Sequence, residues 1–297
     1  MKKTLVAVAA LVATGAFAQV TISGVAEAAI ASKGGNRVLS GGTNGASEVT
    51  FGVVEDLGSG LKAMASTTIC LNQMNGSADN VACGAPTVGA GTNTATTAPI
   101  AHYNSYVGLG GEFGSVKLGQ QFSNTFFVSA LGDNVGRAAV TNYQAGGAQA
   151  QVANSLSYSS PSISGVSVSY QMTLDNTVAG YTNYALNYST GGFAIGYASG
   201  KTGGVTENII GANYDFGIAK IFVGQSTATG QKSAVGYGVN IPFGSLVFGL
   251  GMGSKGTTDN TQFGVTYGLS KRTSVYAAQG QVTGTPNVSL LGVRHNF

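Results

Sequence analysis

The chain has 297 residues, and only 8% of them are charged, against about 25% in an ordinary soluble domain. Its 47 glycines, 13 tyrosines and 13 phenylalanines, with only five prolines, favour strands and turns. The formal net charge is +3, and two of the basic residues belong to the leader described next. The remainder has twelve basic and eleven acidic side chains, which argues against a nucleic-acid partner.

Residues 1–18 have the pattern of a secretory signal peptide. Two lysines begin it, an apolar core follows over residues 5–12, and the small residues Ala16 and Ala18 flank Phe17 before Gln19. The alternative is a membrane anchor, but a spanning helix needs about 20 apolar residues, and this run is shorter. We therefore expect an exported mature chain, residues 19–297, that forms one domain without a transmembrane helix.

The two cysteines, Cys70 and Cys83, lie in one polar segment with twelve residues between them. An oxidising compartment permits a disulfide between them, which would stabilise the loop by roughly 3 kcal/mol through chain entropy. The alternative is a pair of free thiols.

Large apolar residues alternate with small or polar ones along many segments. Residues 184–189, YALNYS, show the pattern, which places the large side chains on one face of a strand and the small ones on the other. The same alternation recurs over residues 193–198, 210–216, 235–241 and 263–269.

Turn signals recur at regular steps in the second half of the chain. The steps are 26 or 27 residues long, which fits a hairpin of two strands of about 9–11 residues with a loop. Seven short turns separate eight hairpins and predict sixteen strands. The short turns are expected near Gly58, Gly111, Pro161, Gly191, Gly217, Phe243 and Ser270. Longer connections are expected at the other rim: residues 34–45, 72–100 and 122–147, then shorter ones near Asp175, Lys201, Thr227, Lys255 and Gly284.

Short turns at one rim and longer loops at the other are typical of a transmembrane β-barrel. A β-sandwich is the alternative, but it would carry charges on its outer faces, whereas here the apolar face is large and aromatic. A sheet in lipid must also close, since an open edge would leave backbone groups unpaired. The sequence therefore predicts an all-β, 16-stranded antiparallel transmembrane barrel with an aqueous lumen.

Residues 122–147 interrupt this pattern, because they show neither strand alternation nor a helical stripe. A connection of this length inside a regular β-protein is usually functional or disordered, and its aromatic residues argue against disorder. We expect this segment to fold into the space inside the barrel wall.

Several segments resemble the general porins of Gram-negative outer membranes, in particular the neisserial and betaproteobacterial branch: SEVTFGVVEDLGSGLKA, SYVGLGGEFGSVKLGQQ, ANSLSYSSPSISGVSVSY, YGLSKRTSVY and LLGVRHNF. The resemblance implies a homotrimer of 16-stranded barrels in contact with outer-membrane lipid and lipopolysaccharide. It also implies that a third outer loop, here residues 122–147, narrows the pore. The terminal Phe297 matches the aromatic residue that the family presents to the barrel assembly machinery.

The chain departs from the family at the arginines that line the pore. In the family, a ladder of arginines on the wall faces acids on the inward loop. The matching positions here are Glu48, Gln120, a site beside Asn154 (Gln151 or Ala153) and Tyr103, and none is an arginine. The resemblance therefore implies a weakened field across the pore.

Alternation also selects the charged residues that should line the lumen. Glu48 and Glu27 share the inward parity and should attract cations; the alternative for Glu48 is a solvated luminal carboxylate without a role. Arg294 also faces inward by its spacing from Phe297, and Lys62 lies near the short-turn rim. Within the inward segment Asp133 and Arg137 are four residues apart, which suits either a role in the constriction or a helical salt bridge that holds the loop.

His102 and His295 form no metal cluster and have no acidic neighbour within a few residues, which argues against an enzyme. We expect a passive diffusion channel for small hydrophilic solutes and ions, without a cofactor, weakly selective and tilted toward cations. A substrate-specific channel and a structural or adhesive barrel are the alternatives.

Overall fold

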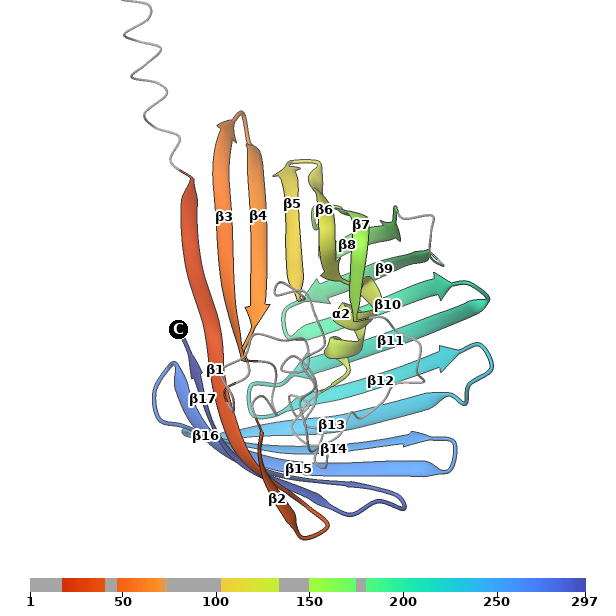
Figure 1. Cartoon of the computed structure of the whole chain (residues 1–297). Helices are drawn as coiled ribbons and strands as arrows, with labels where there is room; N and C mark the ends of the chain where they lie inside the picture. The colour runs from red at the N-terminus through yellow and green to blue at the C-terminus, as the bar shows by residue number, and fades with distance from the viewer. Residues whose placement is uncertain (1–17, 41–46, 72, 74–102, 134–149, 175–179) are drawn as a thin grey trace, which may run out of the picture.

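The protein is a single antiparallel sheet that closes on itself (Figure 1). The computed structural model describes residues 18–40, 47–71, 73, 103–133, 150–174 and 180–297. Consecutive strands pair with each other except β2 and β3, which both pair with β1, and β1 also pairs with β17, which closes the ring. The strands are β1 (Gln19–Lys33), β2 (Asn36–Ser40), β3 (Glu48–Gly58), β4 (Leu61–Cys70), β5 (Asn104–Gly111), β6 (Gly114–Phe122), β7 (Gln151–Ser159), β8 (Val166–Thr173), β9 (Tyr181–Thr190), β10 (Phe193–Thr202), β11 (Val205–Asp215), β12 (Lys220–Ala228), β13 (Ala234–Phe243), β14 (Leu246–Lys255), β15 (Thr258–Gly268), β16 (Thr273–Val282) and β17 (Val288–Asn296).

Strands β2 and β3 occupy one position in the wall. The first part of β1 pairs with β3 from Gln19 to Val25, and its last part pairs with β2 from Ala29 to Lys33. Between these stretches the Ser47 hydroxyl accepts a hydrogen bond from the Glu27 backbone N–H (2.9 Å) and donates one to the Glu27 carbonyl (3.1 Å). The barrel therefore has sixteen strand positions, which confirms the prediction.

The seven predicted short turns are confirmed, because strand boundaries fall at all seven places. The turn between β11 and β12 shows the local chemistry. There the Asp215 side chain accepts a hydrogen bond from the Gly217 N–H (2.8 Å), and Gly217 adopts a φ of 81°, which favours glycine.

The opposite rim differs from the prediction at residues 34–45, where we expected one long connection. Instead Gly34 and Gly35 form a two-residue turn, both with positive φ, and the chain returns at once as β2. Strands β10–β11 and β14–β15 also join through two residues each. Glycine-rich sequence is common to tight turns and long loops, so composition alone did not separate them.

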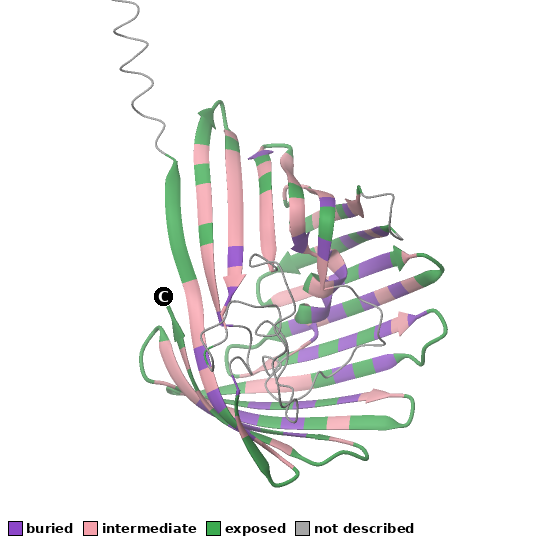
Figure 2. Cartoon of the chain, in the orientation of Figure 1, coloured by how far each residue is buried: buried purple, intermediate pink, exposed green. Residues whose placement is uncertain are grey.

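Exposed and buried residues alternate along the strands of the wall, as the sequence pattern predicted (Figure 2). On β9, the outward side chains Tyr184 and Leu186 are 50% and 51% exposed, whereas Asn183 and Ala185 on the other face are buried. Large apolar side chains therefore point away from the barrel, and small or polar ones point inward. This is the pattern of a barrel whose outer surface contacts hydrocarbon.

A short helix, α2 (Asn124–Leu131), occupies the start of the segment that was predicted to fold inward. It lies inside the barrel against the small-residue face of β9, β10 and β11 (Figure 1). The side chain of Ser123 caps it by accepting a hydrogen bond from the Phe126 N–H (3.0 Å). We predicted no helix here, because eight residues are too few to show an apolar stripe and the wall supplies the missing stabilisation. None of the helices in the described ranges is long and apolar enough to cross a bilayer.

Candidate functional site: the luminal wall and helix α2

Hydrogen bonds fix helix α2 to the wall at both ends. At its start, the Asn124 N–H donates to Asn183 Oδ1 on β9 (2.9 Å), and Ser169 Oγ on β8 donates to Asn124 Oδ1 (2.8 Å). At its end, Asn213 Nδ2 on β11 donates to the Leu131 carbonyl (2.9 Å). These contacts satisfy backbone groups that helix ends leave unpaired, so α2 has a defined position in the lumen.

Small residues on β10 let the helix approach closely. A Cβ at Gly196 would lie 3.0 Å from Val128 Cγ2 and 2.9 Å from Leu131 Cδ1, so a larger residue would displace α2. Val128 is fully buried and packs with Ala185 and Ala198. One face of α2 is therefore committed to the wall.

The opposite face of α2 is open. Thr125, Val128 and Ser129 are buried, whereas Phe127 and Ala130 lie on the other side of the helix. Phe127 is 57% exposed. Since the buried face contacts the wall, Phe127 points toward the middle of the lumen.

Four aromatic rings meet where the chain leaves β6 and enters α2, and we call them the aromatic cluster: Tyr103, Phe122, Phe126 and Phe127. Phe122 stacks on Phe126 with centroids 4.5 Å apart, and Tyr103 contacts Phe122 edge-on at 4.8 Å. Phe127 lies 5.9 Å from both Phe122 and Phe126. Tyr103, predicted at the constriction in place of a basic residue of the family, is one ring of this cluster, and its role in the constriction stays a prediction.

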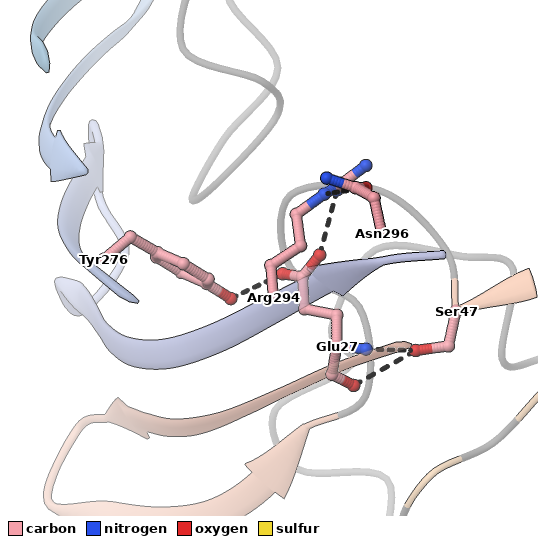
Figure 3. Close-up of polar contacts among 5 residues, drawn as sticks. All are labelled: Glu27, Ser47, Tyr276, Arg294 and Asn296. Carbon is pink, nitrogen blue, oxygen red and sulfur yellow. Dashed lines mark hydrogen bonds and ion pairs between the residues drawn. The ribbon is translucent and has the colours of Figure 1, made fainter. Parts of the chain in front are cut away.

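On the wall opposite α2, an acidic residue of β1 forms an ion pair with a basic residue of β17 (Figure 3). Strand β10, beneath the helix, is eight positions from β1 in either direction around the ring. Glu27 on β1 is 1% exposed and forms an ion pair with Arg294 on β17 (3.1 Å). The Tyr276 hydroxyl on β16 donates to the other Glu27 oxygen (2.5 Å). Glu27 was predicted as an ion-attracting group, but most of its charge is compensated here.

Glu48 faces the same side as Glu27. It is the first residue of β3 and pairs with Val25 on β1 and Cys70 on β4. Val25 is two residues before Glu27, so both carboxylates share a face. Glu48 is half-buried and therefore in contact with solvent.

Two lysines on the luminal face differ in depth. Lys62 pairs with Asp56 and Gly110 next to the short turns, which is the rim position that the sequence predicted. Lys117, which sequence reasoning missed, lies on β6 with its ammonium 4.6 Å from the centroid of the Tyr106 ring. Its neighbours Val116 and Leu118 are large and apolar, so the alternation of β6 already marked it as luminal.

The glutamine of β6 that faces the lumen is Gln121 and not the predicted Gln120. Gln120 pairs with Ser105 in the outward row of Leu118, whereas Gln121 is in the row of Lys117. The register shift against β7 comes from one extra residue of β7 between Val152 and Ser155. Gln121 is buried and accepts a hydrogen bond from Ser157 Oγ (2.6 Å). The resemblance to the family indicated Gln120, whereas the alternation of Val116, Lys117 and Leu118 continues unbroken along β6 and places Gln121 on the luminal face.

Gln151, the other predicted wall position, pairs with Phe122 at the start of β7 and is half-buried. Asp133 lies two residues beyond α2, and Arg137 lies outside the described residues, so their pairing stays a prediction. His295 Nδ1 is 2.9 Å from Thr273 Oγ1 in an exposed pair, and His102 lies outside the described ranges.

Glu207 on β11 is a luminal acid that sequence reasoning missed. It is 2% exposed, and its cross-strand neighbours are Gly200 and Ala228, whose side chains offer no hydrogen bond. Within the part of the chain that the structure describes, neither carboxylate oxygen has a hydrogen-bond partner. The alternation over residues 205–215 was the available signal.

Cys70 is buried at the end of β4 and is disulfide-bonded. Cys83 lies outside the described residues, so the predicted bridge between the two stays a prediction. In the described ranges, histidine, cysteine, aspartate and glutamate side chains form no group of three that could hold a metal.

The sequence matches the family model for Gram-negative porins over residues 4–287. The chain belongs to this family. A search of curated proteins found no match. The porin is thus an integral protein of the Gram-negative outer membrane, and its closed barrel is that of a channel.

Solved porins share the fold at low identity. The anion-selective porin from Comamonas acidovorans has a TM-score of 0.75 at 20% identity, covering 95% of this chain and 100% of its own. OmpT of Vibrio cholerae in its trimer form gives 0.69 at 13% identity, covering 94% and 99%. A mutant of the Rh. blastica porin gives 0.71 at 14% identity, covering 94% and 100%.

Proposed function

We propose that this porin is a passive diffusion channel for small hydrophilic solutes and ions, weakly selective and with a slight preference for cations. The observation that carries the proposal is the polar inner face of a closed sixteen-position barrel, narrowed by helix α2. A barrel of this size retains an aqueous lumen. Solutes would cross down their gradients without a cofactor.

The small number of accessible luminal charges supports weak selectivity. On the described wall, away from the rims, Glu27 is paired with Arg294 and Glu207 is buried, which leaves Glu48 and Lys117. Opposite charges of equal number set up only a small net field in the pore.

The depths of these two charges support a preference for cations. Cys70, which pairs with Glu48, is two residues beyond Thr68, and Thr68 pairs with Asn104. Asn104 Oδ1 accepts a hydrogen bond from the Phe122 N–H (3.3 Å), where the chain turns toward α2. Glu48 therefore lies at the depth where the lumen narrows, whereas Lys117 lies closer to the short turns.

The porin from Comamonas acidovorans is named anion-selective, but at 20% identity the likeness concerns the fold. The sign of selectivity depends on the charges in the narrow zone, so it has to be measured for this chain.

Reversal potentials across a planar bilayer in a salt gradient test the proposal. We expect a modest preference for potassium over chloride, which Glu48→Gln reduces and Glu48→Arg moves toward chloride. Glu112→Gln, at the tip of the turn between β5 and β6, is the matched control and should change little. An anion preference of the unchanged protein, or no shift with Glu48→Arg, would overturn the proposed tilt.

We further propose that the porin assembles as a homotrimer, by analogy with OmpT, which is known in a trimer form. Single-channel recordings should show conductance rising in three equal steps per insertion event. Isolated single steps, together with a monomeric mass in mild detergent, would contradict the trimer.

Lipid and the assembly machinery are the other partners that we propose. Arg37, Lys201 and Lys232 are exposed at the rim of the longer connections, where lysine and arginine suit the phosphates of lipopolysaccharide. Phe297 is proposed as the signal to the barrel assembly machinery, and Phe297→Ala should then lower the amount of folded barrel in cells.

A further inference from the structure

We propose that Phe127 and the aromatic cluster form a binding site for small aromatic solutes that carry a positive charge. This inference rests on the proposed channel function and names the class of solute that the narrow zone retains. Phe127 is the part of the cluster that contacts the solute.

The cluster leaves Phe127 open to a ligand while holding it in place. Phe122 and Phe126 are stacked and support Phe127 from one side at 5.9 Å. The helix face opposite Phe127 is fixed by Val128 against the wall. A held ring that remains 57% exposed in water offers an apolar surface that a flat ring can cover.

The position of Phe127 restricts what can cover it. The ring lies on the luminal side of α2, within a closed wall whose outer face contacts lipid. Membrane lipid is therefore separated from it by the wall, whereas dissolved molecules small enough to diffuse through the pore pass beside it. A second aromatic ring, offset or edge-on, is the partner that a phenyl ring prefers.

Two features favour a positive charge on that solute. The face of an aromatic ring carries negative electrostatic potential and attracts cations. Glu48 on β3 lies across the lumen from β10 at the depth where the chain enters α2, and its half-buried carboxylate contacts solvent. The ring contact and the carboxylate therefore select for an aromatic cation over an aromatic anion.

Single-channel recording with three probes tests the inference. Phenethylamine is the aromatic cation, hexylamine is an aliphatic cation of similar length, and phenylacetate is the aromatic anion. We expect phenethylamine to interrupt the current for times about three- to tenfold longer than hexylamine, as ring stacking predicts. Phenylacetate should interrupt it least.

Two substitutions separate the parts of the site. Phe127→Leu keeps an apolar side chain on the open face of α2 but removes the ring, so it should abolish the difference between phenethylamine and hexylamine. Glu48→Gln should reduce the difference between phenethylamine and phenylacetate. Phe248→Ala, on the outward row of β14, is the matched control and should leave all dwell times unchanged.

Equal dwell times for phenethylamine and hexylamine in the unchanged protein, or unchanged dwell times in Phe127→Leu, would overturn the inference. The open-channel conductance of the same recordings reports on the proposed function separately. A channel that conducts without retaining phenethylamine sinks only the binding site, whereas a silent protein sinks the channel.

Discussion

Glu27 and Arg294 are an ion pair whose members lie near opposite ends of the chain. Arg294 and the Tyr276 hydroxyl together satisfy both carboxylate oxygens of a side chain that is almost completely buried. Gly292 makes room for this arrangement, because a Cβ there would collide with the Tyr276 ring. The pair thus links β1, β16 and β17 at the seam of the barrel.

Arg294→Ala should destabilise the barrel by about 3 kcal/mol, because it leaves a buried carboxylate without its charged partner. It should also shift the reversal potential toward cations, since Glu27 would no longer be compensated. Thermal unfolding in detergent, followed by the gel shift of the folded barrel, measures the first effect and the reversal potential measures the second. The double variant Glu27→Gln/Arg294→Ala is the control and should recover part of the stability; equal loss in both would contradict the ion-pair argument.

Glu207→Gln should raise the free energy of unfolding by about 1–3 kcal/mol. A buried carboxylate without a hydrogen-bond partner is costly to desolvate, and an amide of the same shape carries no charge. The same thermal assay measures it, with the exposed Glu112→Gln as control. A lower free energy of unfolding for Glu207→Gln would show that the carboxylate makes a favourable contact in the folded barrel, and would contradict the prediction.

At the scale of elements, helix α2 shows what tertiary structure adds to a weak local signal. Eight residues form a helix because Ser123 caps its start and Gly196 leaves space for its side chains. The Asn183 side chain and the Tyr181 hydroxyl, both on β9, also form hydrogen bonds with its first residues.

Gly196→Val should lower the single-channel conductance. The added side chain would meet Val128 and Leu131 and push α2 away from β10 into the lumen. Gly204→Val is the matched control, because Gly204 lies in the turn after β10 with no atom within 4 Å of a Cβ. Unchanged conductance in Gly196→Val would mean that α2 does not limit the flow of ions.

The fold could be predicted from the alternation of apolar and polar residues, because this pattern depends only on neighbouring positions in the sequence. In a strand with lipid on one side and water on the other, apolar and polar side chains must alternate every two residues. This alternation was sufficient to predict the sixteen strands and the seven short turns. It also predicted that Glu27, Glu48 and Arg294 face inward. The same rule would have given Lys117 and Glu207.

Other features depend on geometry that no local pattern records. The extra residue of β7 between Val152 and Ser155 shifts the register of β7 against β6. The tight turn at Gly34 and Gly35 had the composition of a loop. The contact between Glu27 and Arg294 joins residues 267 apart in sequence, which only closure of the barrel brings together.

At the scale of the whole molecule, the barrel closes where its two ends meet. Gly24 and Phe297 exchange two backbone hydrogen bonds of 3.0 Å, and the Phe297 ring covers Gly24. A Cβ at Gly24 would collide with the Glu48 carbonyl and the ring.

Gly24→Ala should therefore lower the melting temperature of the folded barrel, because the last pairing of the closed sheet would be forced apart. The gel shift of heated samples measures it. Gly180→Ala, where a Cβ meets nothing within 4 Å, is the control. Equal melting temperatures for the two variants would show that the seam tolerates the extra carbon.

Between β2 and β3, the Ser47 hydroxyl forms the two hydrogen bonds with the Glu27 backbone that a neighbouring strand would otherwise form. Because β1 pairs with both of these strands, the number of residues from Ser40 to Ser47 does not set the pairing of either strand. An epitope or affinity tag inserted between Ser40 and Ser47 should therefore leave the pairing of β1 with both strands unchanged.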